Sequence, residues 1–107
     1  MTRLEVIQLI GDLLARVDLV RSNMMDAPAM RQLDELRSEL GERQRLLTQR
    51  AVDEKDQGFQ NAASQLKTLD QQMRLTMKSS PVDIISLVHK IVTIAALLPG
   101  TDEPEVP

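Results

Sequence analysis

The sequence predicts an all-α fold: an antiparallel bundle of four helices, which we expect to form a dimer. Apolar residues recur at alternating steps of three and four along most of the chain, the spacing of amphipathic helices. Pro and Gly residues divide this pattern into segments. The apolar side chains are almost all aliphatic, because the chain has no Trp, Tyr or Cys and a single Phe. Aliphatic side chains suit packing between helices.

The first helix is predicted near residues 2–25. Thr2 and Glu5 have the spacing of a capping box, in which each residue satisfies a backbone amide of the other. Residues 26–28, Asp-Ala-Pro, separate this helix from the next, since Pro cannot continue a helix but fits the first turn of a new one. The apolar stripe of this helix contains Val6, Ile10, Leu13, Val17, Val20 and Met24.

The second helix is predicted near residues 28–53 and is more polar. Gly41 lies inside it, where Gly lowers stability by about 1 kcal/mol relative to Ala. Glu39 and Arg43 have the i,i+4 spacing of a helical ion pair in this helix, as Asp12 and Arg16 have in the first helix. Its apolar seam is thin and contains Met30, Leu33, Leu36, Leu40 and Leu47.

Residues 53–58 contain no apolar side chain, and the apolar seam changes register across them. In one interpretation Gly58 closes the second helix and a tight turn follows. In the other, a single kinked helix runs from Pro28 to Lys78, which leaves three helices in the bundle. Such a helix would be about 75 Å long, too long for a compact chain of this size. We therefore favour the turn.

The third helix is predicted near residues 58–78, with Asp70 and Arg74 as another i,i+4 pair. The fourth is predicted near residues 81–98, because Ser80 suits the N-cap and Pro81 the first helical position. Twelve of the 17 residues from 82 to 98 are apolar. A surface helix needs about three in seven, so we expect this helix to be covered on most sides.

We assign residues 1–99 to one helical domain and expect residues 100–107, which are acidic and contain two prolines, to be disordered. No apolar stretch approaches the roughly 20 residues that span a bilayer. The N-terminus lacks the charged and apolar regions of a signal peptide. We therefore expect a cytoplasmic protein without a membrane partner.

The residues that could carry chemistry favour a non-enzymatic protein without a cofactor. His89 is the single histidine and lies on the apolar fourth helix, where we expect a buried or interfacial structural role. Asp53, Glu54 and Asp56 are close together but lack the ligand spacing of a calcium loop. A solvated turn explains them, so we predict no metal site.

Function is predicted from an imbalance between the helices. The first and last helices are much more apolar than the middle two, and a two-fold homodimer would cover the excess. We therefore predict an interaction module that binds itself and another protein, as an adaptor, chaperone, inhibitor or antidote, or assembly component. The predicted partner-binding residues are Ile10, Leu13, Val17, Val20, Met24, Ile84, Val88, Ile91 and Ala95.

The alternative is a nucleic-acid-associated accessory protein, with Arg43, Arg45 and Arg50 of the second helix as phosphate contacts. Acidic residues interleave with these arginines, and the chain has no exposed aromatic pattern on which bases would stack. The overall charge of -3 also disfavours a protein built to grip phosphates. We therefore consider nucleic acid a less favoured partner than another protein.

Overall fold

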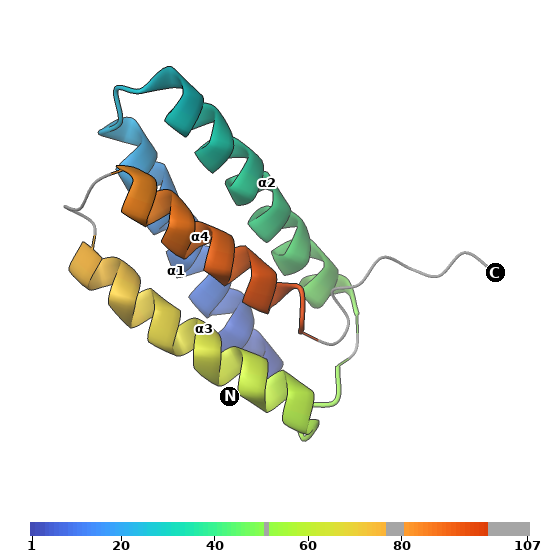
Figure 1. Ribbon diagram of the computed structural model, residues 1–107. Helices are drawn as coiled ribbons and strands as arrows, with labels where there is room; N and C mark the ends of the chain where they lie inside the picture. Colours follow the sequence, from blue (N-terminus) through green and yellow to red (C-terminus); the bar gives the residue numbers. More distant parts are fainter. Residues whose placement is uncertain (51, 77–80, 99–107) are drawn as a thin grey trace.

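The computed structural model describes residues 1–50, 52–76 and 81–98, and these residues form four α-helices packed against one another (Figure 1). The helices are α1 (Arg3–Ser22), α2 (Ala27–Gln49), α3 (Gln57–Thr76) and α4 (Pro81–Ala95). The described residues contain no strand, so the all-α, four-helix prediction is confirmed. The acidic tail predicted at residues 100–107 lies outside the described residues.

Local signals in the sequence set the helix starts. Thr2 Oγ1 accepts a hydrogen bond from Glu5 N at 3.1 Å, and Glu5 Oε1 accepts one from Thr2 N at 3.0 Å, which completes the predicted capping box. Asp26 caps α2 by accepting from Ala29 N at 3.1 Å. Pro81 begins α4 as predicted, whereas its predicted N-cap, Ser80, lies outside the described residues.

The helical conformation is interrupted between α2 and α3, so the prediction of a turn is confirmed and the single long helix is ruled out. Arg50 is in an extended conformation, and residues 52–56 are not helical. The prediction that Gly58 closes α2 is wrong, because Gly58 is the second residue of α3. Asp56 decides this, since its carboxylate accepts from Phe59 N at 2.9 Å and starts α3 before the glycine.

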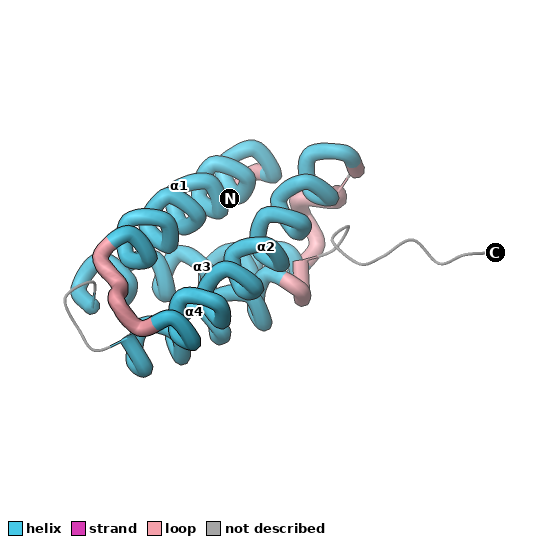
Figure 2. The backbone as a smooth tube through the Cα atoms, turned by 90° about the horizontal axis from the view of Figure 1, so that it is seen from above, coloured by secondary structure: helices cyan, strands magenta, loops and turns pink. Residues whose placement is uncertain are grey.

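The helices are arranged with α4 between α2 and α3, and with α1 behind them in contact with α2 and α3 (Figure 1). Successive helices run in opposite directions, as predicted. The expectation that short connections make successive helices neighbours fails once, because α2 packs against α1 and α4 rather than against α3. The connection after α2 crosses the end of the bundle, as the view from above shows (Figure 2).

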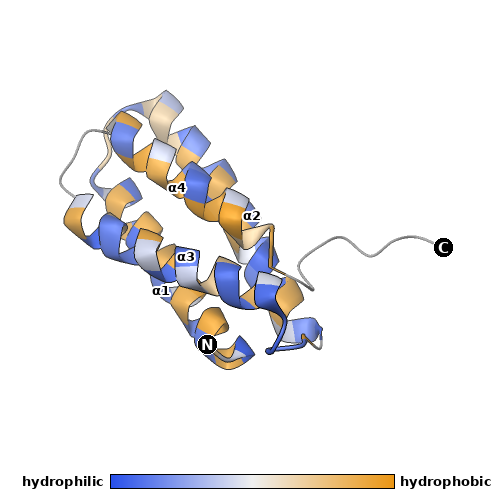
Figure 3. Ribbon diagram, turned by 60° about the horizontal axis from the view of Figure 1, so that its bottom comes forward, coloured by the Kyte–Doolittle hydropathy of each residue, from blue (hydrophilic) through white to orange (hydrophobic). Residues whose placement is uncertain are grey.

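All four helices contribute to the core. The expectation that the middle two helices are too polar to cover α1 and α4 within one chain is therefore corrected. Because α1 and α4 lie diagonally across the bundle, each packs against both α2 and α3. Figure 3 shows how strongly apolar α4 is, yet most of its apolar residues face this core. The seams of α2 and α3 are thin, and Met30 and Leu36 are only half-buried. The fully buried side chains that these two helices contribute include Leu33, Leu40, Leu47, Phe59, Leu66 and Met73. A single chain therefore buries the apolar core faces of α1 and α4.

Charged side chains fasten α1 to its neighbours. Arg21 pairs with Asp34 and Arg37 with Asp18, each at 2.6 Å, so two ion pairs join α1 and α2. The predicted pair of Asp12 with Arg16 does not form within the described residues. Arg16 reaches across to Asp70 on α3 instead.

Candidate docking surface

The predicted partner-binding residues of α1 and α4 lie in the core of the single chain. Eight of the nine are at most 5% exposed: Ile10, Leu13, Val17, Val20, Ile84, Val88, Ile91 and Ala95. Met24 is half-buried at the end of α1. The spacing identified the apolar faces of these helices correctly but assigned them to a partner chain. In the folded subunit a partner has no access to the eight buried residues.

The predicted phosphate contacts of α2 do not form an open row of cations. Arg45 forms an ion pair with Glu42 and also donates to Gln49 Oε1 at 3.0 Å. The hydrogen bond between Arg45 and Glu42 raises the pKa of Arg45 and lowers the pKa of Glu42. Arg43 and Arg50 are half-buried. A phosphate at this surface would have to compete with a carboxylate for Arg45.

The acidic residues before α3 lie in a solvent-exposed turn, as predicted. Asp53 Oδ1 accepts from Lys55 N at 3.0 Å, and Asp56 caps α3. Glu54 Oε1 accepts from Arg3 N at 2.8 Å and so ties the turn to the start of α1. Within the described part of the chain, no three His, Cys, Asp or Glu side chains are grouped to hold a metal ion.

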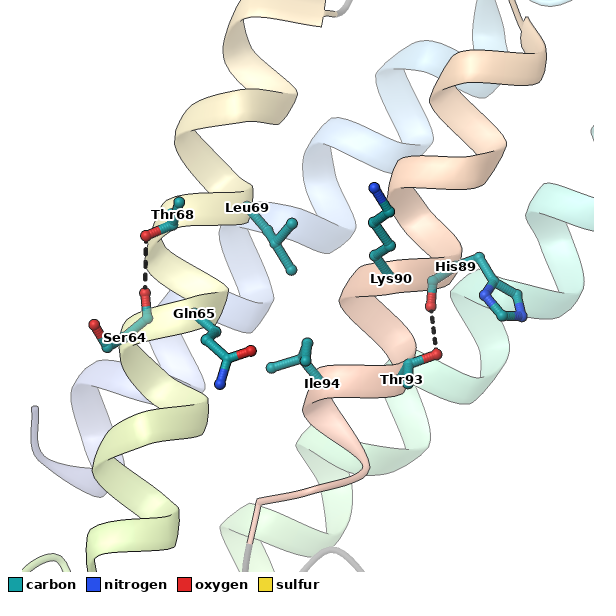
Figure 4. A pocket seen from close by; sticks show the side chains of 8 residues that line it. All are labelled: Ser64, Gln65, Thr68, Leu69, His89, Lys90, Thr93 and Ile94. Atoms are coloured by element: carbon teal, nitrogen blue, oxygen red, sulfur yellow. Dashed lines mark hydrogen bonds between the residues drawn. The ribbon is translucent and has the colours of Figure 1, made fainter.

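A groove of about 590 Å³ lies between α3 and α4 (Figure 4). Leu69 and Ile94 are half-buried and point into it, together with Gln65. His89 is exposed and points away from α3, so the expectation that it is buried within the subunit is wrong. The groove is lined by Ser64, Gln65, Thr68, Leu69, His89, Lys90, Thr93 and Ile94.

Three exposed apolar side chains extend this groove toward both ends of the bundle. Leu75 is 88% exposed and Val82 is 76% exposed, where α3 ends and α4 begins. Leu97, directly after α4, is 61% exposed. Leu75 is seven residues after Thr68 and Val82 seven residues before His89, almost two helical turns in each case, so each points to the same side of its helix as that lining residue. We call these three residues and the groove lining the α3/α4 face.

The α3/α4 face is poor in charge. The 23 residues of α2 include eight charged side chains, whereas the 20 residues of α3 include three and the 15 of α4 include two. Lys90 is the one charged residue that lines the groove. Depletion of charge around apolar side chains distinguishes the centre of protein interfaces from other surface. The α3/α4 face therefore has the composition of a docking surface.

Two hydroxyl groups of the groove lining donate to backbone carbonyls of their own helices. Thr68 Oγ1 donates to Ser64 O at 3.2 Å and Thr93 Oγ1 donates to His89 O at 2.9 Å, each one turn back on its own helix (Figure 4). The protons of these two hydroxyls are therefore already engaged in hydrogen bonds. Such side chains suit the polar rim of a binding surface.

Sequence reasoning missed this face. The signal available was three large apolar residues, Leu75, Val82 and Leu97, at positions where helical spacing predicts the polar side of α3 and α4. No protein-family model matches the chain, and comparisons with curated proteins and with solved structures found none similar to it. None of the described helices has the length and apolar content that crossing a membrane requires.

Proposed function

We propose that this protein is a non-enzymatic protein–protein interaction module and that the α3/α4 face is its docking surface. The supporting observation is a groove between α3 and α4 with exposed apolar side chains toward its two ends, on helices that carry little charge. Leu75 and Val82 lie at one end, Leu69 and Ile94 in the groove, and Leu97 at the other end. Adaptors, chaperones, inhibitors and assembly components all need such a surface.

The size of the apolar contribution fits a binding surface. Burying an exposed Leu or Val side chain completely is worth about 1.5–3 kcal/mol. Three such side chains supply about 4.5–9 kcal/mol at most, which is comparable with the cost of association of about 4–15 kcal/mol and leaves little surplus. The groove must therefore be filled as well, and a partner that contacts only Leu75 or only Leu97 would bind weakly.

The nucleic-acid hypothesis gains no support from α2. Arg37 and Arg45 are paired with Asp18 and Glu42, so part of the arginine content of this helix is neutralised within the chain. Phosphate binding depends on cations that can replace counterions on the nucleic acid. The α3/α4 face offers one Lys, which is insufficient for that mode of binding.

The chain offers a matched pair of variants to test the docking surface. One carries Leu75→Glu and Leu97→Glu on the α3/α4 face. The control carries Leu4→Glu and Leu19→Glu on the outer side of α1, where the two leucines are 63% and 54% exposed. Both variants make the same chemical change at accessible sites, so neither should disturb the core.

Each form is immobilised and challenged with the soluble proteins of its source. We expect a protein that the wild type and the α1 control retain and that the α3/α4 variant loses. Equal retention by all three forms, or loss only in the α1 control, would contradict the proposal.

A further inference from the structure

We infer that a crevice between α1 and α3 binds a free α-amino acid in its zwitterionic form. This site goes beyond the proposed function, because it lies where α3 meets α1 rather than α4. The crevice has a volume of about 340 Å³, at the lower end of the roughly 300–1,000 Å³ of ligand sites. It is lined by Met1, Glu5, Gln8, Leu9 and Asp12 on one side and by Lys67, Asp70, Gln71 and Arg74 of α3 on the other.

The two walls of the crevice carry opposite charges. On α1, Glu5 and Asp12 are seven residues apart, almost two helical turns, and so lie on the same side of the helix. On α3, Lys67 and Arg74 have the same spacing. Hydrogen bonds with Thr2 lower the pKa of Glu5, and the positive charge of Lys67 acts in the same direction. A basic wall therefore faces an acidic wall across the crevice.

The two walls do not neutralise each other directly. Opposite charges at this spacing on neighbouring helices often form ion pairs between the helices. Here Glu5 belongs to the capping box of α1, and Arg74 pairs with the buried Asp70 of its own helix. Among the described residues, the side chains of Asp12 and Lys67 form no hydrogen bond or ion pair. A carboxylate and an ammonium group are thus left for a ligand.

The rest of the lining suits an amino acid. The amides of Gln8 and Gln71, one from each helix, have no side-chain hydrogen bond within the described ranges. Each amide can donate to a carboxylate and accept from an ammonium group. Leu9 is half-buried in the lining and offers apolar surface to an aliphatic side chain of the ligand.

Hydrogen bonds hold α1 and α3 together at both ends of the crevice. At one end, Gln60 Nε2 donates to Met1 O at 2.8 Å. At the other, one turn beyond Asp12, Arg16 Nε donates to Asp70 Oδ1 at 2.9 Å. The walls are therefore in place before a ligand arrives, which lowers the entropic cost of binding.

Charge complementarity selects a zwitterion over a simple ion. Asp12 would attract a cation that Lys67 repels, and an anion would meet the reverse. An α-amino acid carries both charges, so its ammonium group can pair with Asp12 and its carboxylate with Lys67 and Arg74. Because these three side chains are exposed, water screens their charges, and we expect weak binding with a Kd on the order of 1 mM.

NMR titration of the isotope-labelled full chain with L-leucine tests the inference. We expect saturable shifts of the backbone amides in residues 5–12 and 67–74. N-acetyl-L-leucine lacks the ammonium group and L-leucinamide lacks the carboxylate, so each should bind at least about tenfold more weakly. These comparisons use the unaltered protein and do not depend on how a variant folds. The absence of saturable shifts with L-leucine overturns the inference, and so does equal binding of the three compounds.

Matched variants test where the ligand binds. Asp12→Asn and Lys67→Gln each remove the charge of one wall at an exposed position, and each should weaken L-leucine binding by about tenfold or more. Glu35→Gln and Lys55→Gln remove the same charges from exposed positions outside the crevice and should leave binding unchanged. Equal effects of the two pairs would contradict the site. None of the four residues lines the α3/α4 groove, so the proposed function does not depend on this result.

Discussion

Arg16 Nε on α1 donates a hydrogen bond of 2.9 Å to Asp70 Oδ1 on α3. Asp70 is 3% exposed and is the one charged or polar residue that is buried within the described part of the chain. Arg74, one turn further along α3, approaches the other carboxylate oxygen at 3.2 Å. The carboxylate lies at a core position of α3, so its pairing fixes how α1 and α3 align.

Removal of Arg16 should be costly. In Arg16→Met the Asp70 carboxylate stays buried, with the largely exposed Arg74 as its remaining cation. Removal of one partner leaves the buried carboxylate less well compensated, and because Arg74 still pairs with it we expect a loss of about 2–3 kcal/mol in the free energy of unfolding. Urea denaturation followed by circular dichroism measures this loss.

The double variant Arg16→Met, Asp70→Leu provides the control. Replacing both partners of a buried pair with apolar residues is often nearly neutral, so the double variant should recover most of the lost stability. The single variant Asp70→Leu completes the cycle. If the double variant loses as much stability as Arg16→Met and Asp70→Leu added together, the two side chains are not coupled and the ion pair does not fix the alignment of α1 and α3.

Gly41→Ala should stabilise the protein. Gly41 lies inside α2, and a Cβ atom there would have no neighbour within 4 Å. The gain should be about 0.8–1 kcal/mol, the difference between Gly and Ala within a helix. For a domain of this size, that corresponds to an increase in Tm of about 3–8 °C, which calorimetry can measure.

Gly11→Ala is the matched comparison, because the same change has a different environment. A Cβ atom at Gly11 would lie 3.2 Å from Gln44 Nε2, which donates to Ile7 O at 3.1 Å and joins α2 to α1. We expect a smaller gain than for Gly41→Ala, or a loss. A larger gain at Gly11 would show that this contact between the helices is unimportant.

Acid should weaken the attachment of α1 to α2. Hydrogen bonds from Arg37 and Arg21 hold the pKa values of Asp18 and Asp34 below their ordinary value of 3.8. Because these pKa values are lowered in the folded state, their stabilising contribution is complete above the unfolded value. It is lost as the pH falls below 3.8 through the lowered values.

The urea midpoint measured between pH 2 and pH 7 checks this prediction. The pH values should be spaced most closely around the ordinary carboxyl pKa of roughly 4. The wild type should lose stability on the acid side of this range. A variant with Arg21→Gln and Arg37→Gln should lose less over the same interval. Identical slopes for the two proteins would mean that these surface pairs do not contribute, as is found for many exposed ion pairs.

Arg3→Met should destabilise the end of α2. Arg3 Nη1 donates to the carbonyl oxygens of Leu47 at 3.0 Å and Arg50 at 2.8 Å, where the last turn of α2 leaves carbonyls unpaired. A positive charge there also interacts favourably with the helix dipole. We expect a loss of about 1–2 kcal/mol in the free energy of unfolding, measured by urea denaturation.

Hydrogen exchange shows which part of the chain the Arg3→Met substitution destabilises. Amide protection should fall in the last turn of α2 and in residues 52–56, and should change little at the α1–α2 connection. Lys at position 3 keeps the charge, so Arg3→Lys should lose less stability than Arg3→Met. An equal loss would assign the effect to packing of the side chain rather than to its charge.

The sequence predicted the helices because their signals are local. The Thr2–Glu5 capping box, Pro28 and Pro81 all act within one turn of the chain. Helical spacing also identified the core faces of α1 and α4, including Ile10 and Ile91. One local error was Gly58, where the cap formed by Asp56 started a helix before a residue that more often ends one.

By itself, the sequence determined four helices, their limits to within a few residues, and the side of each that is buried. Only the tertiary structure decided what covers each buried side. It placed α4 between α2 and α3, paired Arg16 with Asp70 rather than with Asp12, and left Leu75, Val82 and Leu97 exposed on one face. The physical reason is that periodicity records which side of a helix avoids water, whereas its neighbours depend on contacts between residues far apart in the chain.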